Sequence, residues 1–556
     1  MNISDFMKRH QLKHTKTKRA KVLLICGILC SLLSVAIAML ARRRQRGPAV
    51  AASSPSVQSL PDKTSAAAPY DAIDRYIEQG LKRMNVPGAA VAIVEGDQIV
   101  HQRGFGQAHP GGTPPSPQTP FFMGSLTKSF TALAVMQLVE AGKVALDAPV
   151  QRYLPWFRVA DAQASAQMTV RQLLNQTSGL SAVSGWAPLA DFDSSPGAGE
   201  RQARALAALQ LSRPVGSAFE YSNTNYNLLG LIVEATSGES YATYVQNHIF
   251  SPLDMRHSYT TPGEAQQNGL AVGHRYWFSY PVVDDTDKQY AFSSLPSGGL
   301  ISSAEDMSHY LIAQLNEGRY HGVQILSPAG IAEMHRQAAA ANMMGVSLGQ
   351  YGMGWFIDER GQVRIVSHSG VVPAFFAYMA ILPGQNKGLV LLMNADHFLM
   401  QNFTLLEVGM GAATLLAGAR PDPVRWGVVI PWVLRGLLLL PALHILGVAA
   451  TLLRLRRWRQ HPSSRPSRSR MWVQHILLPM LPNLLVAATP IAQAASPLSG
   501  FLWLYAPDLS WLARICGSFA GVWIFLRSGL ILWTLRKDQS SQALVHTTYK
   551  ESSYET

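Results

Sequence analysis

SLTKSFTALAVMQLVEAGK, residues 125–143, has apolar side chains recurring at spacings of three and four, which predicts a helix with Ser125 in its first turn. Because residues three apart share a helix face, Lys128 stacks against the Ser125 hydroxyl. Burial can lower a lysine pKa by about 3 to 5 units, so such an amine can act as a base, and the helix N-terminus favours developing negative charge. Alone, S-x-x-K is uninformative, because about one match is expected by chance in this chain.

Two later motifs make the serine more informative. Tyr221-Ser222-Asn223 is the only Y-x-N in the chain and precedes a predicted helical run, and its phenol can shuttle a proton. His368-Ser369-Gly370 follows further on, and we expect it to begin a strand at the edge of a sheet, facing the serine.

S-x-x-K, Y-x-N and H-[ST]-G in this order resemble the signature of the penicillin-recognising serine hydrolases, in their class C β-lactamase and D-peptidase (S12-type) branch. The resemblance covers about residues 70–418. Four further segments are similar to the family: VPGAAVAIV from Val86, LLNQTSGL from Leu173, PSGGLISSAEDM from Pro296 and YGMGWFI from Tyr351.

The resemblance implies a role for each motif residue. Ser125 is the nucleophile, and Lys128 with Tyr221 are the general bases of acylation and deacylation. Asn223 holds the acyl side-chain amide, and the amides of Ser125 and Val371, which follows Gly370, form an oxyanion hole that stabilises the transition state by about 3 kcal/mol per donor. His368 and Ser369 line the leaving-group side. The scheme requires no metal or organic cofactor.

The motifs also depart from the family pattern. Gln176 stands where many relatives have histidine, which changes a structural hydrogen bond. His368 stands where many penicillin-binding enzymes have a lysine that attracts a substrate carboxylate, which favours esters or peptides over β-lactams. The stretch from Trp186 to Gly199 is open to two interpretations, a lid over the site or a solvated loop.

The ends of the same region predict the fold class. A helix at 71–83 is followed by a hairpin of strands at 89–94 and 99–105, and three more strands at 363–366, 374–382 and 388–393 precede a helix at 405–416. The middle, 125–315, reads mostly as helix and loop. We therefore expect an α+β fold, an antiparallel sheet flanked by helices with a helical lobe, as in serine β-lactamases and penicillin-binding proteins, together with transmembrane helices.

The charge distribution indicates a membrane protein. The 556 residues carry a net charge of +13, but residues 1–46 hold eleven cations against one acid and residues 454–470 hold seven cations and no acid. The remainder is therefore mildly acidic, which excludes a nucleic-acid surface. All three cysteines fall in apolar stretches outside residues 70–418, which excludes a disulfide framework and a cysteine nucleophile in the region that carries the motifs, and no H-E-x-x-H motif supports a zinc hydrolase.

Four apolar stretches are long enough to cross a bilayer. Residues 22–41 have no charge, and the arginines that follow favour an uncleaved anchor over a signal peptide, although Ala49-Val50-Ala51 leaves cleavage open. The cation bias places the N-terminus in the cytoplasm. We predict a basic cytoplasmic N-terminus (1–21), an anchor or signal (22–41), an Ala/Ser/Pro-rich linker (42–69), an exported hydrolase domain (70–418), three transmembrane helices (426–535) with a basic cytoplasmic loop (454–471), and a cytoplasmic tail (536–556).

The predicted protein is thus a multi-pass serine hydrolase of the bacterial cytoplasmic (inner) membrane, with its catalytic domain on the extracytoplasmic side. Its substrate would be a cell-wall peptide, an ester, a β-lactam or an acylated prodrug, cleaved through an acyl-serine. The three C-terminal spans resemble those of the peptidases that remove an acylated D-asparagine cap from colibactin-type prodrugs, although Phe122 stands where those peptidases have an acid. Two hypotheses without turnover stay open beside the hydrolase: a sensor of β-lactams or peptidoglycan, and a pseudoenzyme that binds cell-wall peptide.

Overall fold

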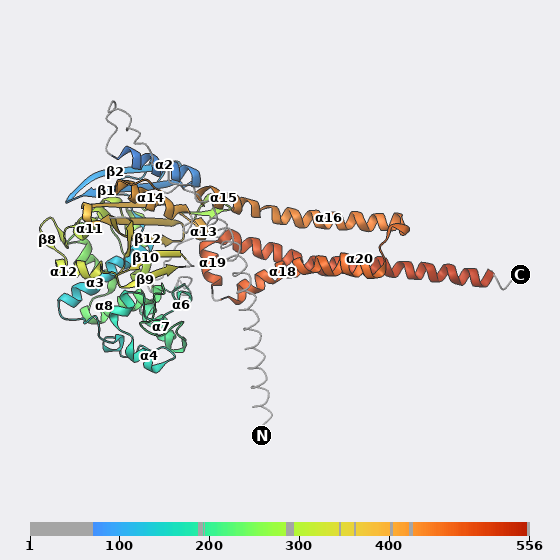
Figure 1. Ribbon diagram of the computed structural model, residues 1–556, viewed down its shortest axis with the longest axis horizontal. Helices are drawn as coiled ribbons and strands as arrows, with labels where there is room; N and C mark the ends of the chain where they lie inside the picture. Colours follow the sequence, from blue (N-terminus) through green and yellow to red (C-terminus); the bar gives the residue numbers. More distant parts are fainter. Residues whose placement is uncertain are drawn as a thin grey trace, which may run out of the picture. The chain divides into compact units, whose positions relative to one another are not determined.

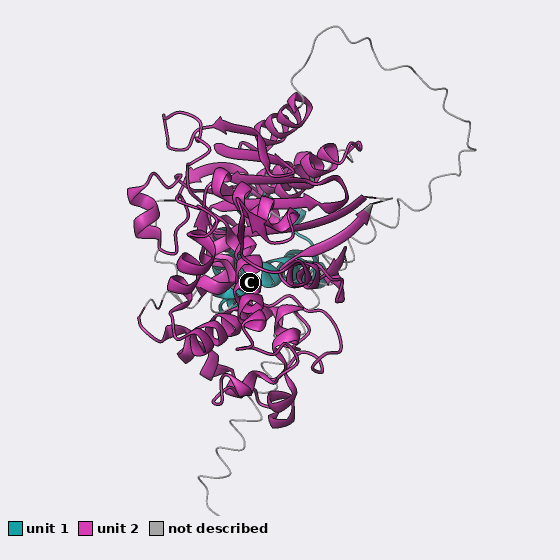
Figure 2. Cartoon of the chain, turned by 90° about the vertical axis from the view of Figure 1, so that its left-hand side faces the viewer, with its two compact units in different colours: residues 1–68, 448–499, 512–556 teal, residues 69–447, 500–511 magenta. Residues whose placement is uncertain are grey.

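The computed structural model describes residues 70–186, 193, 195–284, 294–343, 346–360, 363–400, 404–421, 426–496 and 498–552. The chain divides into two compact units, coloured in Figure 2: a large one made of residues 69–447 and 500–511, and a second that includes 448–499 and 512–556. The predicted anchor at 22–41, the linker at 42–69 and most of the loop after Trp186 lie outside the described residues.

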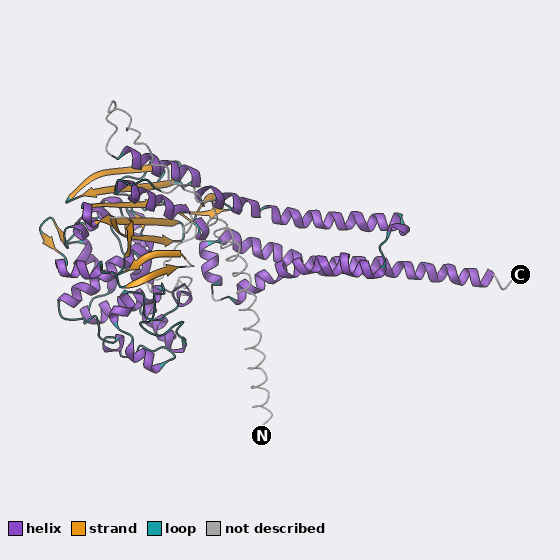
Figure 3. Ribbon diagram, in the orientation of Figure 1, coloured by secondary structure: helices purple, strands orange, loops and turns teal. Residues whose placement is uncertain are grey.

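The large unit is built on an antiparallel sheet of eight strands in its described part (Figures 1 and 3). The prediction that both ends of the domain supply strands to one antiparallel sheet is confirmed, and these strands pair directly, with Ala89 opposite Met393. In spatial order the strands are β2 (Gln98–Gly106), β1 (Gly88–Glu95), β14 (Lys387–Met393), β13 (Phe375–Leu382), β12 (Val363–Val372), β11 (Phe356–Arg360), β10 (Val346–Tyr351) and β9 (Ala339–Met343).

Each face of the sheet is covered by a separate hydrophobic core. Alternate strand residues belong to different cores: Val91 and Ile93 pack with helices α2 (Asp71–Met84) and α14 (Leu406–Leu416), whereas Ala92 and Val94 face the helical lobe. All eight residues of β13 are buried, because this strand has helices on both sides. The α+β class, with helices flanking an antiparallel sheet, is confirmed.

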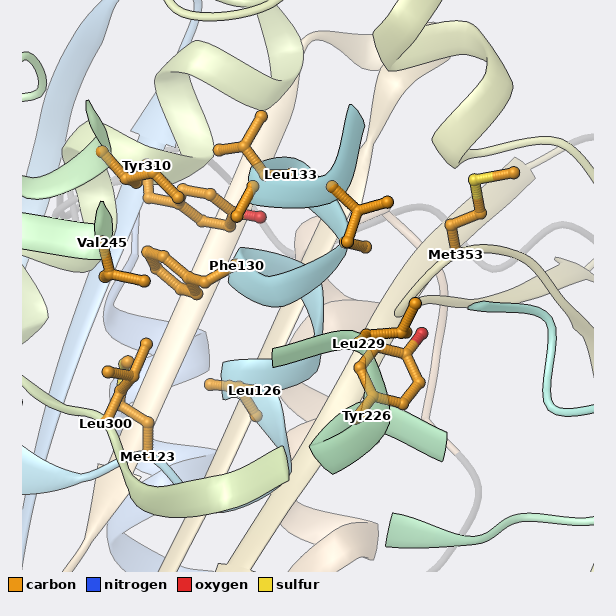
Figure 4. Close-up of a cluster of buried hydrophobic side chains, with 14 of the residues drawn as sticks. Met123, Leu126, Phe130, Leu133, Tyr226, Leu229, Val245, Leu300, Tyr310 and Met353 are labelled. Carbon is orange, nitrogen blue, oxygen red and sulfur yellow. The ribbon is translucent and has the colours of Figure 1, made fainter. Parts of the chain in front are cut away.

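The helical lobe is centred on α3 (Thr127–Glu140), which is buried on nearly all sides. Its Phe130 stacks on Tyr310 of α11 (Ala304–Leu315), with ring centroids 4.0 Å apart (Figure 4), and burying a side chain of this size stabilises the fold by about 1.5 to 3 kcal/mol. The other helices between the sheet's two ends are α4 (Ala162–Gln167), α5 (Val170–Leu174), α6 (Ala182–Trp186), α7 (Ala198–Arg204), α8 (Asn223–Ser237), α9 (Tyr241–Val245), α10 (Pro262–Gln267) and α12 (Pro328–Met334).

The position of β12 differs from the prediction. This strand runs from Val363 to Val372 and lies inside the sheet, between β11 and β13, rather than at its edge. The edge is occupied by β9, and the three strands β9 to β11 were not predicted. Their sequences AAANM, VSLGQY and FIDER lack a regular alternation of apolar and polar residues, so no period-two pattern marks them.

Small sheets complete the large unit. Strand β15 (Ala395–Asp396) runs parallel to β4 (His274–Trp277), which pairs with β5 (Tyr280–Val283). Two further pairs are β3 (Phe121–Phe122) with β6 (Ile301–Ser302), and β7 (Arg319–Tyr320) with β8 (Val323–Gln324).

Three helical stretches in the described residues after 420 are long and apolar enough to cross a membrane: Gly427–Gln460, Met471–Ala495 and Pro507–Thr534. They contain α15 (Trp426–Leu437), α16 (Leu439–Gln460), α18 (Leu478–Ala495) and the first part of α20 (Pro507–Ser552), and α19 (Ser499–Tyr505) lies between the last two stretches. Large apolar side chains along them are exposed, including Phe525 and Ile491, as expected for helices whose surroundings are lipid.

Candidate active site

Ser125 lies where the chain enters the central helix of the lobe. Residues Gly124–Leu126 form a single 3-10 turn that continues directly into α3, so the hydroxyl stands at the N-terminal end of a buried helix. Ser125 is half-buried, whereas Lys128, one turn later, has no exposed surface. The Lys128 Nζ atom lies 2.9 Å from Ser125 Oγ, which is the contact that the spacing of three predicts.

The surroundings of Lys128 suit a general base. In addition to lying next to Ser125 Oγ, the Nζ atom donates to Asn223 Oδ1 at 2.7 Å and to the carbonyl oxygen of Ser297 at 2.6 Å. Both oxygens can only accept, so a neutral amine uses its two N–H bonds on them and directs its lone pair at the serine hydroxyl. Burial lowers the pKa of Lys128 well below its usual value, which favours this neutral form.

Asn223, the first residue of α8, is held in one orientation. Its Nδ2 atom donates to the carbonyl oxygen of Gly185 at 3.2 Å, and because a carbonyl cannot donate, the Oδ1 atom must face Lys128. The backbones of Gly185 and Asn223 approach closely, since a Cβ on Gly185 would lie 2.4 Å from the backbone nitrogen of Asn223. Asn223 therefore orients the lysine, and its orientation depends in turn on Gly185.

Tyr221 is the second group that can take the serine proton. Burial raises the pKa of Tyr221 well above its usual value, with Tyr351 adding to the rise and a hydrogen bond to Ser125 opposing it. Lys128 Nζ lies 4.8 Å from the centre of the Tyr221 ring. The Ser125 proton thus has two neighbouring acceptors, and the high pKa keeps Tyr221 a phenol, so it acts as a proton shuttle rather than as a resident anion.

The loop that carries Tyr221 is fixed by Gln176. The Gln176 Oε1 atom accepts from the backbone N–H of Ser222 at 2.9 Å and from Asn225 Nδ2 at 2.5 Å, and its carbonyl accepts from the N–H of Glu220 at 2.8 Å. Although many relatives have histidine at position 176, the glutamine found here still forms hydrogen bonds to the Y-x-N segment.

Strand β12 passes so close to the turn that bears Ser125 that two positions at the contact, Gly124 and Gly370, have no room for a Cβ atom. A Cβ on Gly370 would lie 1.8 Å from the Met123 carbonyl oxygen, and one on Gly124, whose φ is +55°, would lie 2.2 Å from the Val371 amide nitrogen. The β11–β12 ladder ends at Phe356 and Ser367, whereas β13 pairs onward to Val372. The last residues of β12 thus extend past the end of its pairing with β11.

His368 lies on the same face of β12 as Gly370 and is buried. Its Nδ1 atom donates to the Ser369 carbonyl at 2.6 Å, so the unprotonated Nε2 atom faces the Tyr351 hydroxyl 3.5 Å away. Burial, with a smaller contribution from Lys128, lowers the pKa of His368 to about 3. Ser369 lies opposite Tyr378, so the two side chains share one face of the sheet, and Tyr378 belongs to the core on the face opposite to that of His368. The predicted role of the Ser369 side chain on the leaving-group side stays a prediction.

We expect His368→Asn to leave the acidic limb of the kcat/KM profile where it is in the native protein. With a pKa of about 3, this imidazole is neutral from about pH 5 to 9 and contributes no limb there. Lys128 must lose a proton before it can act, so activity falls in both proteins as the pH drops through the lowered lysine pKa. Steady-state rates across that range test this expectation, and a limb displaced by one unit in the variant would contradict it.

The structure brings together most of the residues that the motifs predicted. Ser125, Lys128, Tyr221 and Asn223 are linked by direct contacts, and Gly370 and Val371 border them. Sequence reasoning missed the carbonyl groups of Ser297 and Gly185. Ser297 lies in the family-like PSGGLISS segment, which was a usable signal, whereas nothing in the sequence marks Gly185.

Comparison with known proteins identifies the class to which this fold and site belong. The family model described as Beta-lactamase matches residues 73–407, more than half of the chain. Penicillin-binding protein 4 of Amycolatopsis lactamdurans is 32% identical over 323 residues, covering 56% of this chain and 81% of that protein. Protein flp of Staphylococcus aureus (strain MW2) is 29% identical over 329 residues, 58% of this chain, and the match spans only 63% of its length.

Solved structures agree with this assignment. The octameric penicillin-binding protein homologue from Pyrococcus abyssi is 28% identical with a TM-score of 0.55, over 64% of this chain and 79% of that one. A class C β-lactamase, 20% identical with a TM-score of 0.52 over 62% and 96% of the two chains, shares the fold. The chain therefore belongs to the β-lactamase family, which also contains penicillin-binding proteins and whose members are generally serine hydrolases.

Proposed function

We propose that this protein is a membrane-anchored serine hydrolase that cleaves an amide or ester of a D-amino-acid compound through an acyl-enzyme on Ser125. The observation that carries the proposal is the Lys128 amine, which is buried, held by two obligatory acceptors and directed at the Ser125 hydroxyl at 2.9 Å. This arrangement activates a nucleophile without a metal or a histidine.

The reaction follows from these contacts. Lys128 or Tyr221 takes the proton of Ser125 as Oγ attacks the carbonyl carbon, and the amides of Ser125 and Val371 stabilise the oxyanion. Tyr221 then passes a proton to the leaving amine or alcohol, and the C–N or C–O bond breaks. Water next attacks the acyl-serine with the same groups as base, which releases the acid and restores the hydroxyl.

The substrate class is inferred from what surrounds the nucleophile. His368 is a neutral imidazole rather than a fixed cation, so the site lacks the charge that would attract a carboxylate at that position. This favours peptides and esters over β-lactams. A related fold, SurE, 25% identical with a TM-score of 0.50, has a solved structure with D-Leu, and this supports a D-amino-acid compound as ligand here.

Membrane attachment is part of the proposal. The three apolar helices after residue 420, together with residues 22–41, would give four spans, with the basic segment 454–471 in the cytoplasm and the catalytic domain outside it. A prodrug peptidase of the colibactin-maturation type is a second candidate, favoured by the same number of C-terminal spans. Against it, Phe122 is buried against Phe375, so no charge at that position can pair with a substrate amine.

The test is a labelling time course on the membrane-bound protein with a fluorescent penicillin and, separately, a fluorophosphonate, with Ser125→Ala in parallel. We expect fluorophosphonate label that depends on Ser125, and penicillin label that is weak or decays by deacylation. Persistent penicillin label without turnover would overturn the proposal in favour of a sensor. If hydrolysis of acylated D-amino-acid amides and of esters were unaffected by Ser125→Ala, the assignment of the nucleophile would be wrong.

A further inference from the structure

The chain that follows the second candidate span, up to the first residues of the third, folds as part of the catalytic unit. Residues 500–511, which we call the 500–511 segment, group with residues 69–447 although α18 ends just before them and α20 begins within them. Several of these residues are fully or almost fully buried: Phe501, Tyr505, Ala506 and Asp508. A connection between two membrane spans would ordinarily be exposed, so its burial calls for an explanation.

Asp508 anchors the segment to the small sheet beside the main one. Its Oδ1 atom accepts from His397 Nε2 at 3.0 Å, and its Oδ2 atom accepts from the backbone N–H of Phe278 at 2.9 Å. The N–H of Leu399 donates to His397 Nδ1 at 3.2 Å, which fixes the imidazole tautomer with its proton towards Asp508. Both side chains have no exposed surface, and a buried carboxylate of this kind is stable only while its donors are in place.

The segment presents aromatic side chains to the region of the catalytic site. Phe501 stacks on Trp186, with ring centroids 5.0 Å apart and planes 16° apart, and it meets the edge of Phe398 at 5.6 Å. Tyr505 stacks on Phe501 at 4.5 Å. Burial raises the pKa of Tyr505, and Asp396 and Tyr221 add to the rise.

Trp186 connects this aromatic group to the catalytic lysine. It directly follows Gly185, whose carbonyl accepts from Asn223 Nδ2, and Asn223 Oδ1 in turn accepts from Lys128 Nζ. The stack on Phe501 holds α6 (Ala182–Trp186) at its C-terminal end, just before residues that the structure does not describe. A shift of Trp186 would therefore move the carbonyl that orients the Asn223 amide.

We propose that the 500–511 segment is a positioning element of the active site, in which Asp508 fixes the segment and Phe501 holds Trp186, so that Gly185 keeps Asn223 directed at Lys128. Phe501 and Asp508 are positioning residues and touch no reacting atom. The inference rests on the proposed function, because its readout is acylation of Ser125.

The test compares full-length variants purified in one detergent. We expect Phe501→Ala to slow acylation by about tenfold or more with little change in KM, because a small misplacement of a catalytic group costs rate rather than binding. Phe501→Tyr should restore the rate. Asp508→Asn should also slow acylation. The side-chain NH₂ group of asparagine would face one of the two donors, His397 Nε2 or the backbone N–H of Phe278, that now hydrogen bond to the carboxylate.

A double-mutant cycle separates positioning from general destabilisation. If Phe501 acts through Asn223, the Phe501→Ala and Asn223→Ala pair should be no slower than Asn223→Ala alone, whereas independent effects multiply. Phe525→Ala is the matched control, because this side chain is 79% exposed on the same helix that follows the segment, and it should acylate at the native rate. If Asp508→Asn does not fold, as judged by protease resistance, the cycle on Phe501 carries the test.

The outcomes distinguish the two proposals. If Ser125→Ala is acylated as fast as the native protein, the proposed function is wrong. Acylation that depends on Ser125 but is equally fast in Phe501→Ala, or multiplicative effects in the cycle, would overturn the positioning role and leave the proposed function intact.

Discussion

Replacing Lys128 by alanine is expected to slow acylation of Ser125 by about 10⁴-fold, at the upper end of what a general base contributes. The reason is that the amine is the group placed 2.9 Å from Ser125 Oγ with its lone pair free, while the neighbouring Tyr221 has a raised pKa and is a poor base by itself. In steady-state hydrolysis of an activated ester, the loss of kcat should be about as large as that of Ser125→Ala, because residues that act as a unit do not add. Stopped-flow acylation measures the Lys128→Ala effect directly, whereas Ser125→Ala has no hydroxyl to acylate.

Two further lysine variants make this prediction specific. Lys128→Arg keeps a cation at the position but cannot lose its proton, so it should be as inactive as the alanine variant. Lys143→Ala removes an exposed lysine just beyond the C-terminus of the same helix and should leave the rate unchanged. Substantial activity in Lys128→Arg would mean that the lysine contributes charge rather than basicity.

Gly370→Ala is expected to lower the acylation rate by about 10²- to 10³-fold, the cost of losing one oxyanion donor. The added Cβ would lie 1.8 Å from the Met123 carbonyl oxygen and 2.9 Å from Leu126 Cδ1, so β12 must move away from the turn that bears Ser125. The amide of Val371 moves with it. Binding of a non-covalent product analogue should change much less than the acylation rate, because the oxyanion forms only during reaction.

The matched control for this substitution is Gly384→Ala. That glycine follows the end of β13, is exposed, and has no atom within 4 Å of the position its Cβ would take. Its rate and melting temperature should match those of the native protein. A Gly370→Ala protein that is folded and acylates within threefold of the native rate would show that the close approach of β12 is not needed for oxyanion stabilisation.

The motifs pointed to residues that the structure brings together, but not to the groups that hold them in place. Ser125 and Lys128 could be placed together because a helix has a fixed period, and Tyr221 with Asn223 followed from family resemblance. The family-like segment around Ser297 was a signal for that region, but the roles of the Ser297 and Gly185 carbonyls depend on the tertiary fold, because every residue has a carbonyl and only the fold selects which one faces Lys128 or Asn223. The same holds for Asp508, which lies nearly 400 residues after Lys128 and carries no motif.

The fold was predictable where apolar residues recur in a regular or continuous pattern along a helix or strand. The hairpin of β1 and β2 and the buried strands β13 and β14 have strong apolar patterns, and the predicted sheet is present. Strands β9 to β11 have none, and each joins the sheet by pairing with its neighbour: β11 with β12, β10 with β11 and β9 with β10. That omission is why β12 was expected at the edge.

The pairing of Ala89 with Met393 has a consequence for biogenesis. At a synthesis rate of about 5 to 20 residues per second, β14 leaves the ribosome roughly 15 to 60 s after β1, and the first hairpin waits that long for its neighbour. Apolar strand edges stay open to chaperones or to wrong partners during this interval. Asp508 arrives later still, after a second apolar helix has been made, so the nascent chain reaches its working form only when almost all of it has been translated.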